Sequence, residues 1–251
     1  MTVGIEIFKK HFEDCKDQYV VIGGTACFLL LQEEHLDFRA TKDLDIVLCV
    51  EALNEKFVEK FWSFVHEAGY LFQHRSTGER CFYRFEKPKD SRYPYMIEIL
   101  SQKPKILTER EPGSIVPMAI GDDIVSLSAI LLDPIYYEFI KMQKTDIDGI
   151  TVATDICIIP LKARAWIDLN ERLNNGVSIR GNDIAKHKKD IYRMTQLLST
   201  IALVDVPQSI KNDIRIFVEK IEDDDNLLKQ LNIAGLTISE IKRRLLHVYC
   251  S

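Results

Sequence analysis

The strongest constraint on the fold is a short buried strand that runs into a helix at a pair of glycines. Residues 19–22, Tyr-Val-Val-Ile, form a continuous apolar run of the kind found in buried strands. Gly23-Gly24 ends this run, and residues 25–34 are rich in Ala and Leu without Gly or Pro, which predicts a helix. A second buried strand is predicted over residues 44–50, so the chain begins by alternating strand and helix.

Further elements complete this first part of the chain. Helices are expected over residues 4–16 and 58–68, and strand-like runs occur at residues 70–72, 81–85 and 95–100. The Asp148-Gly149 pair favours a tight hairpin turn, and apolar runs at residues 136–142 and 150–156 flank it. These elements predict a mixed sheet flanked by helices, an α/β (α+β) fold.

Beyond Pro160 the pattern changes to long helices. They are expected over residues 161–173, 182–199, 208–222 and 238–249. We therefore expect two domains: an α/β core over residues 1–159, and a helical C-terminal domain over residues 160–251 that contributes to the active-site cleft.

Composition excludes several classes of protein. The chain has 251 residues and is 46% hydrophobic, which is enough apolar material for a core and excludes overall disorder. A net charge of -5 argues against a uniformly basic nucleic-acid-binding surface. The six cysteines include no Cys-x-x-Cys pair, so no structural zinc site is expected. No run approaches the ~20 apolar residues of a membrane span, and the start lacks a secretory signal, so we expect a cytoplasmic protein without a membrane partner.

The residues most informative about chemistry are Asp43 and Asp45, which follow the double glycine and its helix. Residues two apart on a strand point to the same face, with Cβ atoms roughly 7 Å apart. Two carboxylates this close repel each other unless a cation lies between them. The pair therefore predicts a site for Mg²⁺ or Mn²⁺.

Glu98 is the candidate third metal ligand, because it interrupts an otherwise apolar strand at residues 95–100. An unpaired buried charge costs several kcal/mol, whereas an adjacent strand would place Glu98 at the metal site. Two ions ~4 Å apart can activate an attacking oxygen and neutralise a leaving pyrophosphate. Gly23 and Gly24 would let backbone N–H groups approach phosphate oxygens, and Thr25 would add a hydroxyl at the helix start.

This order of motifs resembles the DNA polymerase beta superfamily of nucleotidyltransferases, and more closely the AbiEii-type nucleotidyltransferases, known as toxins of abortive-infection and toxin-antitoxin systems. Residues 22–26, Ile-Gly-Gly-Thr-Ala, match the opening motif of that family. Arg39-x-Thr41-x-Asp43-x-Asp45 matches its Arg-x-(Ser/Thr)-x-Asp-x-Asp signature. The resemblance covers residues 18–199 and implies a nucleotidyltransferase-type sheet.

The same resemblance extends into the helical part. Residues 160–165 are similar to the Lys-Leu-x-Ala helix of the family, and residues 186–192 to its late Lys-x-x-x-Asp motif. It implies that Lys162 contacts the nucleotide phosphates, and that Asp190 orients Lys162 or a substrate hydroxyl. Arg39 and Thr41 would position phosphate or brace the strand of acids. The chain departs from the family in having Glu98 where Asp is common, and His187 where a second acid often lies.

Each of these motifs also has an explanation without function. Asp-x-Asp alone fits two solvated acids at a strand end, and Gly23-Gly24 alone fits an ordinary strand-to-helix turn. Residues 186–189 fit the exposed face of an amphipathic helix. A cation at the start of a helix opposes the helix dipole, which favours a functional reason for Lys162. The occurrence of all these motifs in the family's order favours an active site.

The resemblance implies transfer of a nucleoside monophosphate from a nucleoside triphosphate to an acceptor. The toxin-like motifs favour RNA or protein as the acceptor, with a cognate antitoxin as a partner. The acidic balance suits a small cationic antibiotic equally well, so an antibiotic or metabolite nucleotidyltransferase stays open. A catalytically idle nucleotide-binding or antitoxin-interacting module is the remaining alternative, and the intact Asp43 and Asp45 argue against it.

Overall fold

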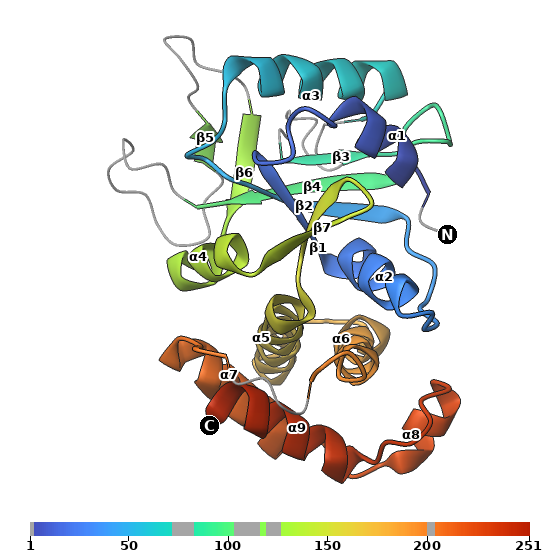
Figure 1. Ribbon diagram of the computed structural model, residues 1–251, viewed down its shortest axis with the longest axis vertical. Coiled ribbons are helices and arrows are strands. Elements are labelled where there is room, and N and C mark those ends of the chain that lie inside the picture. Colours follow the sequence, from blue (N-terminus) through green and yellow to red (C-terminus); the bar gives the residue numbers. More distant parts are fainter. Residues whose placement is uncertain (1–2, 72–82, 103–115, 119–126, 200–203) are drawn as a thin grey trace. The chain divides into compact units, whose positions relative to one another are not determined.

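The computed structural model describes residues 3–71, 83–102, 116–118, 127–199 and 204–251. The chain forms two compact units (Figure 1). The first, here called the sheet unit, comprises Met1–Leu29 and Arg39–Ala153, and the second, the helical unit, comprises Leu30–Phe38 and Thr154–Ser251. None of the helices in the described residues combines the length and the apolar character that a membrane crossing needs.

A mixed sheet of eight strands forms the centre of the sheet unit, as far as its residues are described. Its strands are β1 (Tyr19–Ile22), β2 (Asp43–Leu48), β3 (Arg84–Glu86), β4 (Met96–Ser101), β5 (Val116–Met118), β6 (Leu127–Leu131), β7 (Lys144–Ile147) and β8 (Ile150–Ala153). They follow the order β5-β6-β4-β2-β1-β8-β7, and β3 pairs with β4. β2 lies antiparallel to β1 and parallel to β4. The predicted mixed sheet flanked by helices is confirmed.

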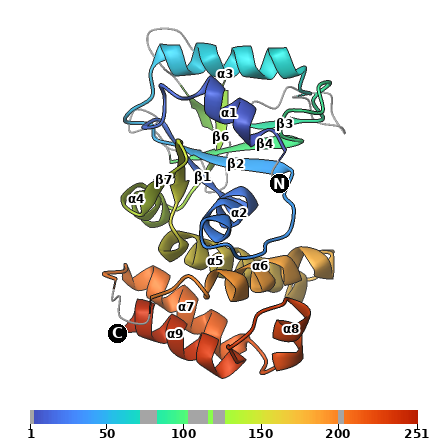
Figure 2. The same ribbon diagram turned by 45° about the vertical axis from the view of Figure 1, so that its right-hand side comes forward.

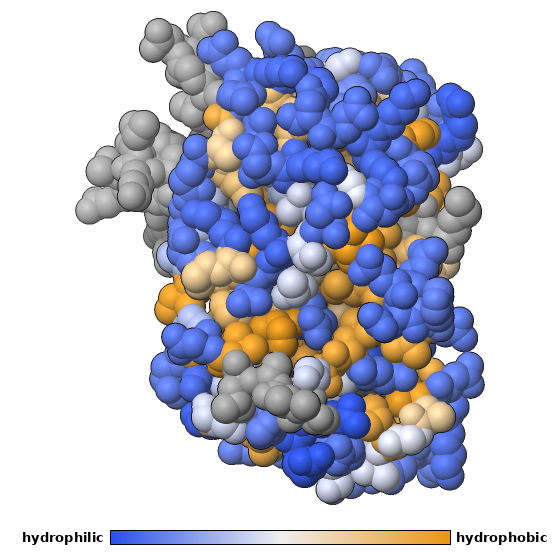
Figure 3. Space-filling view, in the orientation of Figure 1, coloured by the Kyte–Doolittle hydropathy of each residue, from blue (hydrophilic) through white to orange (hydrophobic). Residues whose placement is uncertain are grey.

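Helices cover both faces of this sheet (Figures 1 and 2). α1 (Ile5–His11) and α3 (Glu55–Ala68) lie on one face, and the start of α2 (Gly23–Glu33) and α4 (Pro134–Met142) lie on the other. α3 ends where the sequence predicts, because Gly69 caps it with a φ of 66°. In the space-filling view the outward side of α1 and α3 is largely hydrophilic, as amphipathic helices require (Figure 3).

Aromatic rings fill the space under α1 and α3. Their centroids lie between 4.6 and 6.3 Å apart. The rings belong to Phe8, Phe12, Phe57, Phe61 and Phe64, all of which are 0% exposed. Each buried phenylalanine contributes about 1.5–3 kcal/mol, so this cluster is a main source of stability for the sheet unit and holds the sheet rigid.

The strand register determines which face the acids of β2 take. Leu44 lies beside Ile97 of β4, and Ile97 lies beside Phe85 of β3. The ring centroid of Phe85 lies 5.2 Å from that of Phe61 in α3. Leu44 therefore faces α3. Because side chains alternate along a strand, Asp43 and Asp45 point to the opposite face, where α2 begins.

The helical unit consists of the last part of α2 with α5 (Asp155–Asn174), α6 (Gly181–Met194), α7 (Gln208–Lys220), α8 (Asp225–Gln230) and α9 (Ile238–Cys250). The expectation that a helix begins after Pro160 is wrong, since α5 begins at Asp155 and Pro160 lies inside it. Proline has no N–H for the carbonyl of Ile156, and the hydroxyl of Tyr249 donates to that oxygen instead, at 3.1 Å. A contact from α9 thus lets α5 continue through its proline.

The predicted hairpin turn at Asp148-Gly149 is confirmed, but the segments that flank it differ from the expected apolar runs. Asp148 and Gly149 have φ values of 47° and 84°, as a tight turn between β7 and β8 requires. The preceding apolar run forms the helix α4, because Asp133 caps its first turn and Pro134 begins it, and β7 follows that helix. Of the other predicted strands, Phe72, Cys81 and Phe82 lie outside the described residues.

Candidate active site

Asp45 lies against the double glycine at the start of α2. Gly23 and Gly24 are the first residues of α2, so the helix begins two residues before the expected start at Thr25. Gly23 has a φ of 69°, and a Cβ built there would stand 1.9 Å from Oδ2 of Asp45. Only a residue without a side chain lets the carboxylate come this close. Asp45 is therefore held at a helix N-terminus, where backbone N–H groups favour negative charge.

Two threonine hydroxyls hold the backbone of β2 at Asp43. Thr25 is fully buried and donates to the carbonyl oxygen of Asp43 at 2.8 Å. Thr41, 6% exposed, donates to the same oxygen at 3.4 Å. In this structure both threonines therefore act on the position of Asp43 through its backbone.

Arg39 lies above the start of α2. A Cβ added to Gly24 would meet Nη2 of Arg39 at 3.3 Å and Oγ1 of Thr41 at 3.1 Å. The Arg39 side chain is exposed overall, so its guanidinium combines proximity to the helix start with access to solvent. This arrangement places a positive charge beside the N-terminus of α2, near Asp45.

Glu98 lies directly beside Asp45 and is ion-paired to Arg84. The β2–β4 register pairs Asp45 with Glu98, and the β3–β4 register pairs Glu98 with Arg84. Nε of Arg84 donates to Oε1 of Glu98 at 2.6 Å, and Nη2 donates to the same oxygen. The Glu98 side chain is 19% exposed and that of Arg84 is 48% exposed. Sequence analysis did not single out Arg84, although it interrupts an apolar strand as Glu98 does.

The three predicted metal ligands lie near one another but do not form a metal site as the structure has them. Within the described ranges, no three His, Cys, Asp or Glu side chains are arranged to hold a metal ion. Asp43 and Asp45 nevertheless share one face of β2, with Glu98 next to Asp45, and carboxylate oxygens are the ligands that Mg²⁺ prefers.

Lys162 and Asp190 form a buried ion pair within the helical unit. Nζ of Lys162 donates to Oδ2 of Asp190 at 3.0 Å, and the two side chains are 9% and 0% exposed. The argument that Lys162 opposes the dipole at a helix start is wrong, because α5 begins at Asp155 and Lys162 lies about two turns further along. A buried charge needs a partner of opposite charge, so Asp190 explains why Lys162 can be buried, and Lys162 explains why Asp190 can be buried.

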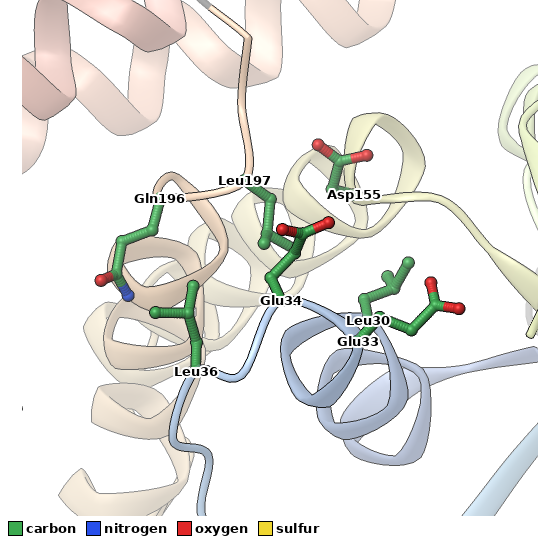
Figure 4. Close-up of a pocket in the computed structure, with 7 residues that line it drawn as sticks. All are labelled: Leu30, Glu33, Glu34, Leu36, Asp155, Gln196 and Leu197. Atoms are coloured by element: carbon green, nitrogen blue, oxygen red, sulfur yellow. The ribbon is translucent and has the colours of Figure 1, made fainter.

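An acidic hollow of about 400 Å³ lies in the helical unit (Figure 4). Its polar lining includes Glu33 and Glu34 from the end of α2, Asp155 from the start of α5 and Gln196 from beyond α6. Burial raises the pKa of the Asp155 carboxyl. Sequence analysis did not predict this hollow, because its acids come from distant segments that only the fold brings together.

Comparisons with known proteins give a weak structural similarity. Models of protein families do not match this chain, and no curated protein matches it. Among solved structures it is similar to the solution structure of the antibiotic-resistance factor ANT(2'')-Ia, a nucleotidyltransferase, with 11% sequence identity and a TM-score of 0.35. The match covers 86% of this chain and 92% of the other. Similarity at this level does not assign an activity.

Proposed function

We propose that this chain is a metal-dependent nucleotidyltransferase that moves a nucleoside monophosphate from a nucleoside triphosphate to an acceptor. The observation that carries the proposal is the approach of Asp45 to Gly23. It brings a carboxylate able to bind a cation together with helix N–H groups able to bind phosphate. Asp43 on the same face and Glu98 on the next strand supply further carboxylates.

In this proposal Asp43, Asp45 and Glu98 would hold Mg²⁺ or Mn²⁺. The bound cation would neutralise the leaving pyrophosphate and help to ionise the attacking hydroxyl. The N–H groups of Gly23 and Gly24 would bind phosphate oxygens at the start of α2. These groups are held in place before substrate binds, which lowers the cost of reaching the transition state.

Other residues would orient this machinery. Thr25 and Thr41 would brace Asp43 through its carbonyl oxygen, and Arg39 would position a phosphate above Gly24. Lys162 would balance negative charge on the phosphates, with Asp190 fixing its ammonium group.

For the acceptor, the AbiEii-like motifs favour RNA or protein, with a cognate antitoxin as a partner. A second candidate is a small cationic acceptor such as an aminoglycoside antibiotic. The acidic hollow of the helical unit favours it, because its carboxylates can bind amino groups and its volume of about 400 Å³ can hold a small ligand.

The test is transfer of label from each α-³²P nucleoside triphosphate with Mg²⁺ or Mn²⁺. Total RNA, a protein extract and an aminoglycoside are offered as separate acceptors. We expect Asp43→Asn and Asp45→Asn to lower the rate about 100-fold or more, since each removes charge from the metal site. Asp17→Asn changes an exposed aspartate on the same unit and serves as the control. Wild-type labelling by Asp45→Asn would overturn the proposal, and triphosphate binding without any labelling would favour the idle module.

A further inference from the structure

We propose that a second groove in the helical unit binds a nucleotide unit, with its phosphate at two lysines and its base over an apolar floor. This groove, here called the lysine groove, shares no residue with the candidate active site. The inference therefore goes beyond the proposed function and does not depend on it.

The first step is the shape of the lysine groove. It has a volume of about 520 Å³ and lies where α5, the first half of α6 and the end of α7 meet. Trp166, Asn170 and Asn174 line it from α5, and because they are spaced four residues apart they follow one face of that helix. A hollow of several hundred Å³ is large enough for a small ligand.

The second step is the charge of the lysine groove. Lys188 lines it from α6, and Lys220 lines it from the last position of α7. Neither lysine forms an ion pair within the described part of the chain, whereas Lys186 on α6 pairs with Asp183. Glu222 adds one negative charge to the lining, so the two ammonium groups leave it positive. A phosphate bound by both lysines would relieve their mutual repulsion.

The third step is the floor of the lysine groove. Trp166 and Ile184 line it with apolar side chains and are each 8% exposed. The ring centroid of Trp166 lies 5.2 Å from that of Phe217, which holds the indole in place. Nδ2 of Asn170 donates to the carbonyl oxygen of Trp166 at 2.7 Å, which leaves Oδ1 and one N–H of that amide for a ligand. A rigid apolar surface beside amide groups suits a nucleobase, which has a flat apolar face and a polar edge.

The two hollows of the helical unit therefore suit ligands of opposite charge. Glu33, Glu34 and Asp155 line the acidic hollow, which would repel a phosphate. In the lysine groove Lys188 and Lys220 outweigh a single carboxylate. A net charge of -5 for the whole chain thus coexists with a local site for an anion.

The experiment is titration of the full-length chain with AMP by isothermal titration calorimetry, without divalent cations. We expect Lys188→Gln and Lys220→Gln each to weaken AMP binding about fivefold, because each removes a charged contact with phosphate. Ribose 5-phosphate, which lacks the base, should bind about tenfold more weakly than AMP. Lys211→Gln is the matched control, because Lys211 lies on α7 outside the lysine groove and the change in charge is the same.

Two further measurements locate the ligand and identify its source. The fluorescence of Trp166 in a Trp62→Phe background should change when AMP binds, because Trp166 lies in the floor of the groove. An oligoadenylate of about ten nucleotides then separates RNA from a free nucleotide. Lysine-dependent binding tighter than that of AMP assigns the groove to RNA, and binding no tighter assigns it to a free nucleotide.

Several results would overturn the inference. They are an absence of AMP binding, wild-type affinity in the double variant Lys188→Gln/Lys220→Gln, an equal loss in Lys211→Gln, and equal affinity for AMP and ribose 5-phosphate. Asp45→Asn should leave AMP binding unchanged whether or not it loses labelling, so the lysine groove and the proposed function fail separately. Circular dichroism confirms that each variant is folded.

Discussion

Removing one partner of the buried Lys162–Asp190 ion pair should cost much more stability than removing both. The charged atoms are 3.0 Å apart, and the side chains are 9% and 0% exposed. At an effective dielectric constant of about 20, unit charges at this separation attract by roughly 5.5 kcal/mol. Lys162→Met removes that attraction and leaves the Asp190 carboxylate buried. We therefore expect a loss of about 3–5 kcal/mol in the free energy of unfolding.

The double variant Lys162→Met/Asp190→Leu should recover most of this loss, because it leaves no buried charge without a partner. The measurement is urea unfolding followed by the fluorescence of Trp166, which lies in α5, in a Trp62→Phe background. Arg172→Met is the matched control on the same helix. Arg172 pairs with Asp168, and both side chains are at least half exposed, so its loss should cost only about 0–1 kcal/mol.

Two results would refute this reasoning. One is a loss below about 1 kcal/mol for Lys162→Met, which would mean that solvent or rearrangement replaces the missing ammonium group. The other is a double variant whose loss equals the sum of the single losses, which would mean that the two charges are not coupled. The stability data are also needed to interpret activity. Lys162 is proposed to act on the nucleotide, so the activity of Lys162→Met must be divided by the fraction of that variant that is folded.

Two further predictions concern Gly23 in the sheet unit and Asp155 in the helical unit, with Gly176 as a control for the first. Gly23→Ala places a Cβ 1.9 Å from Oδ2 of Asp45, so it should displace the acid and lower labelling at least about tenfold. Gly176→Ala, with a φ of 84° and no atom within 4 Å of the added Cβ, should lose about 1 kcal/mol of stability and keep full activity. Asp155→Asn should raise the melting temperature at pH 7, because burial raises the pKa of Asp155 and penalises its charged form.

The sign of the Asp155 effect follows from proton linkage. The folded protein keeps the proton of Asp155 to a higher pH than the unfolded chain, so stability falls as pH rises from the ordinary pKa through the raised folded value. Asp155→Asn removes this fall, and the melting temperature of the variant should depend less on pH across that window. For Gly23→Ala, wild-type labelling would contradict the close contact with Asp45. A lower melting temperature of Asp155→Asn at pH 7 would contradict the desolvation of its carboxylate.

Local chemistry explains the elements that the sequence predicted well. The strand at residues 19–22, the end of α3 at Gly69 and the hairpin at Asp148-Gly149 depend on neighbouring residues, through apolar runs and positive φ angles. The predicted helix start after Pro160 failed because a distant residue decided the outcome. α5 passes through Pro160 with the help of Tyr249.

The sequence by itself determined that Asp43 and Asp45 share a face, because alternation along a strand needs no knowledge of the rest of the chain. Only the tertiary structure placed Glu98 beside Asp45 and Arg84 beside Glu98, since those contacts depend on the strand order β3-β4-β2. The pairing of Lys162 with Asp190 likewise depends on how α5 packs against α6. Strand and helix pairings join segments far apart in the chain, and the local residue pattern that defines each segment does not specify which other segment it will meet.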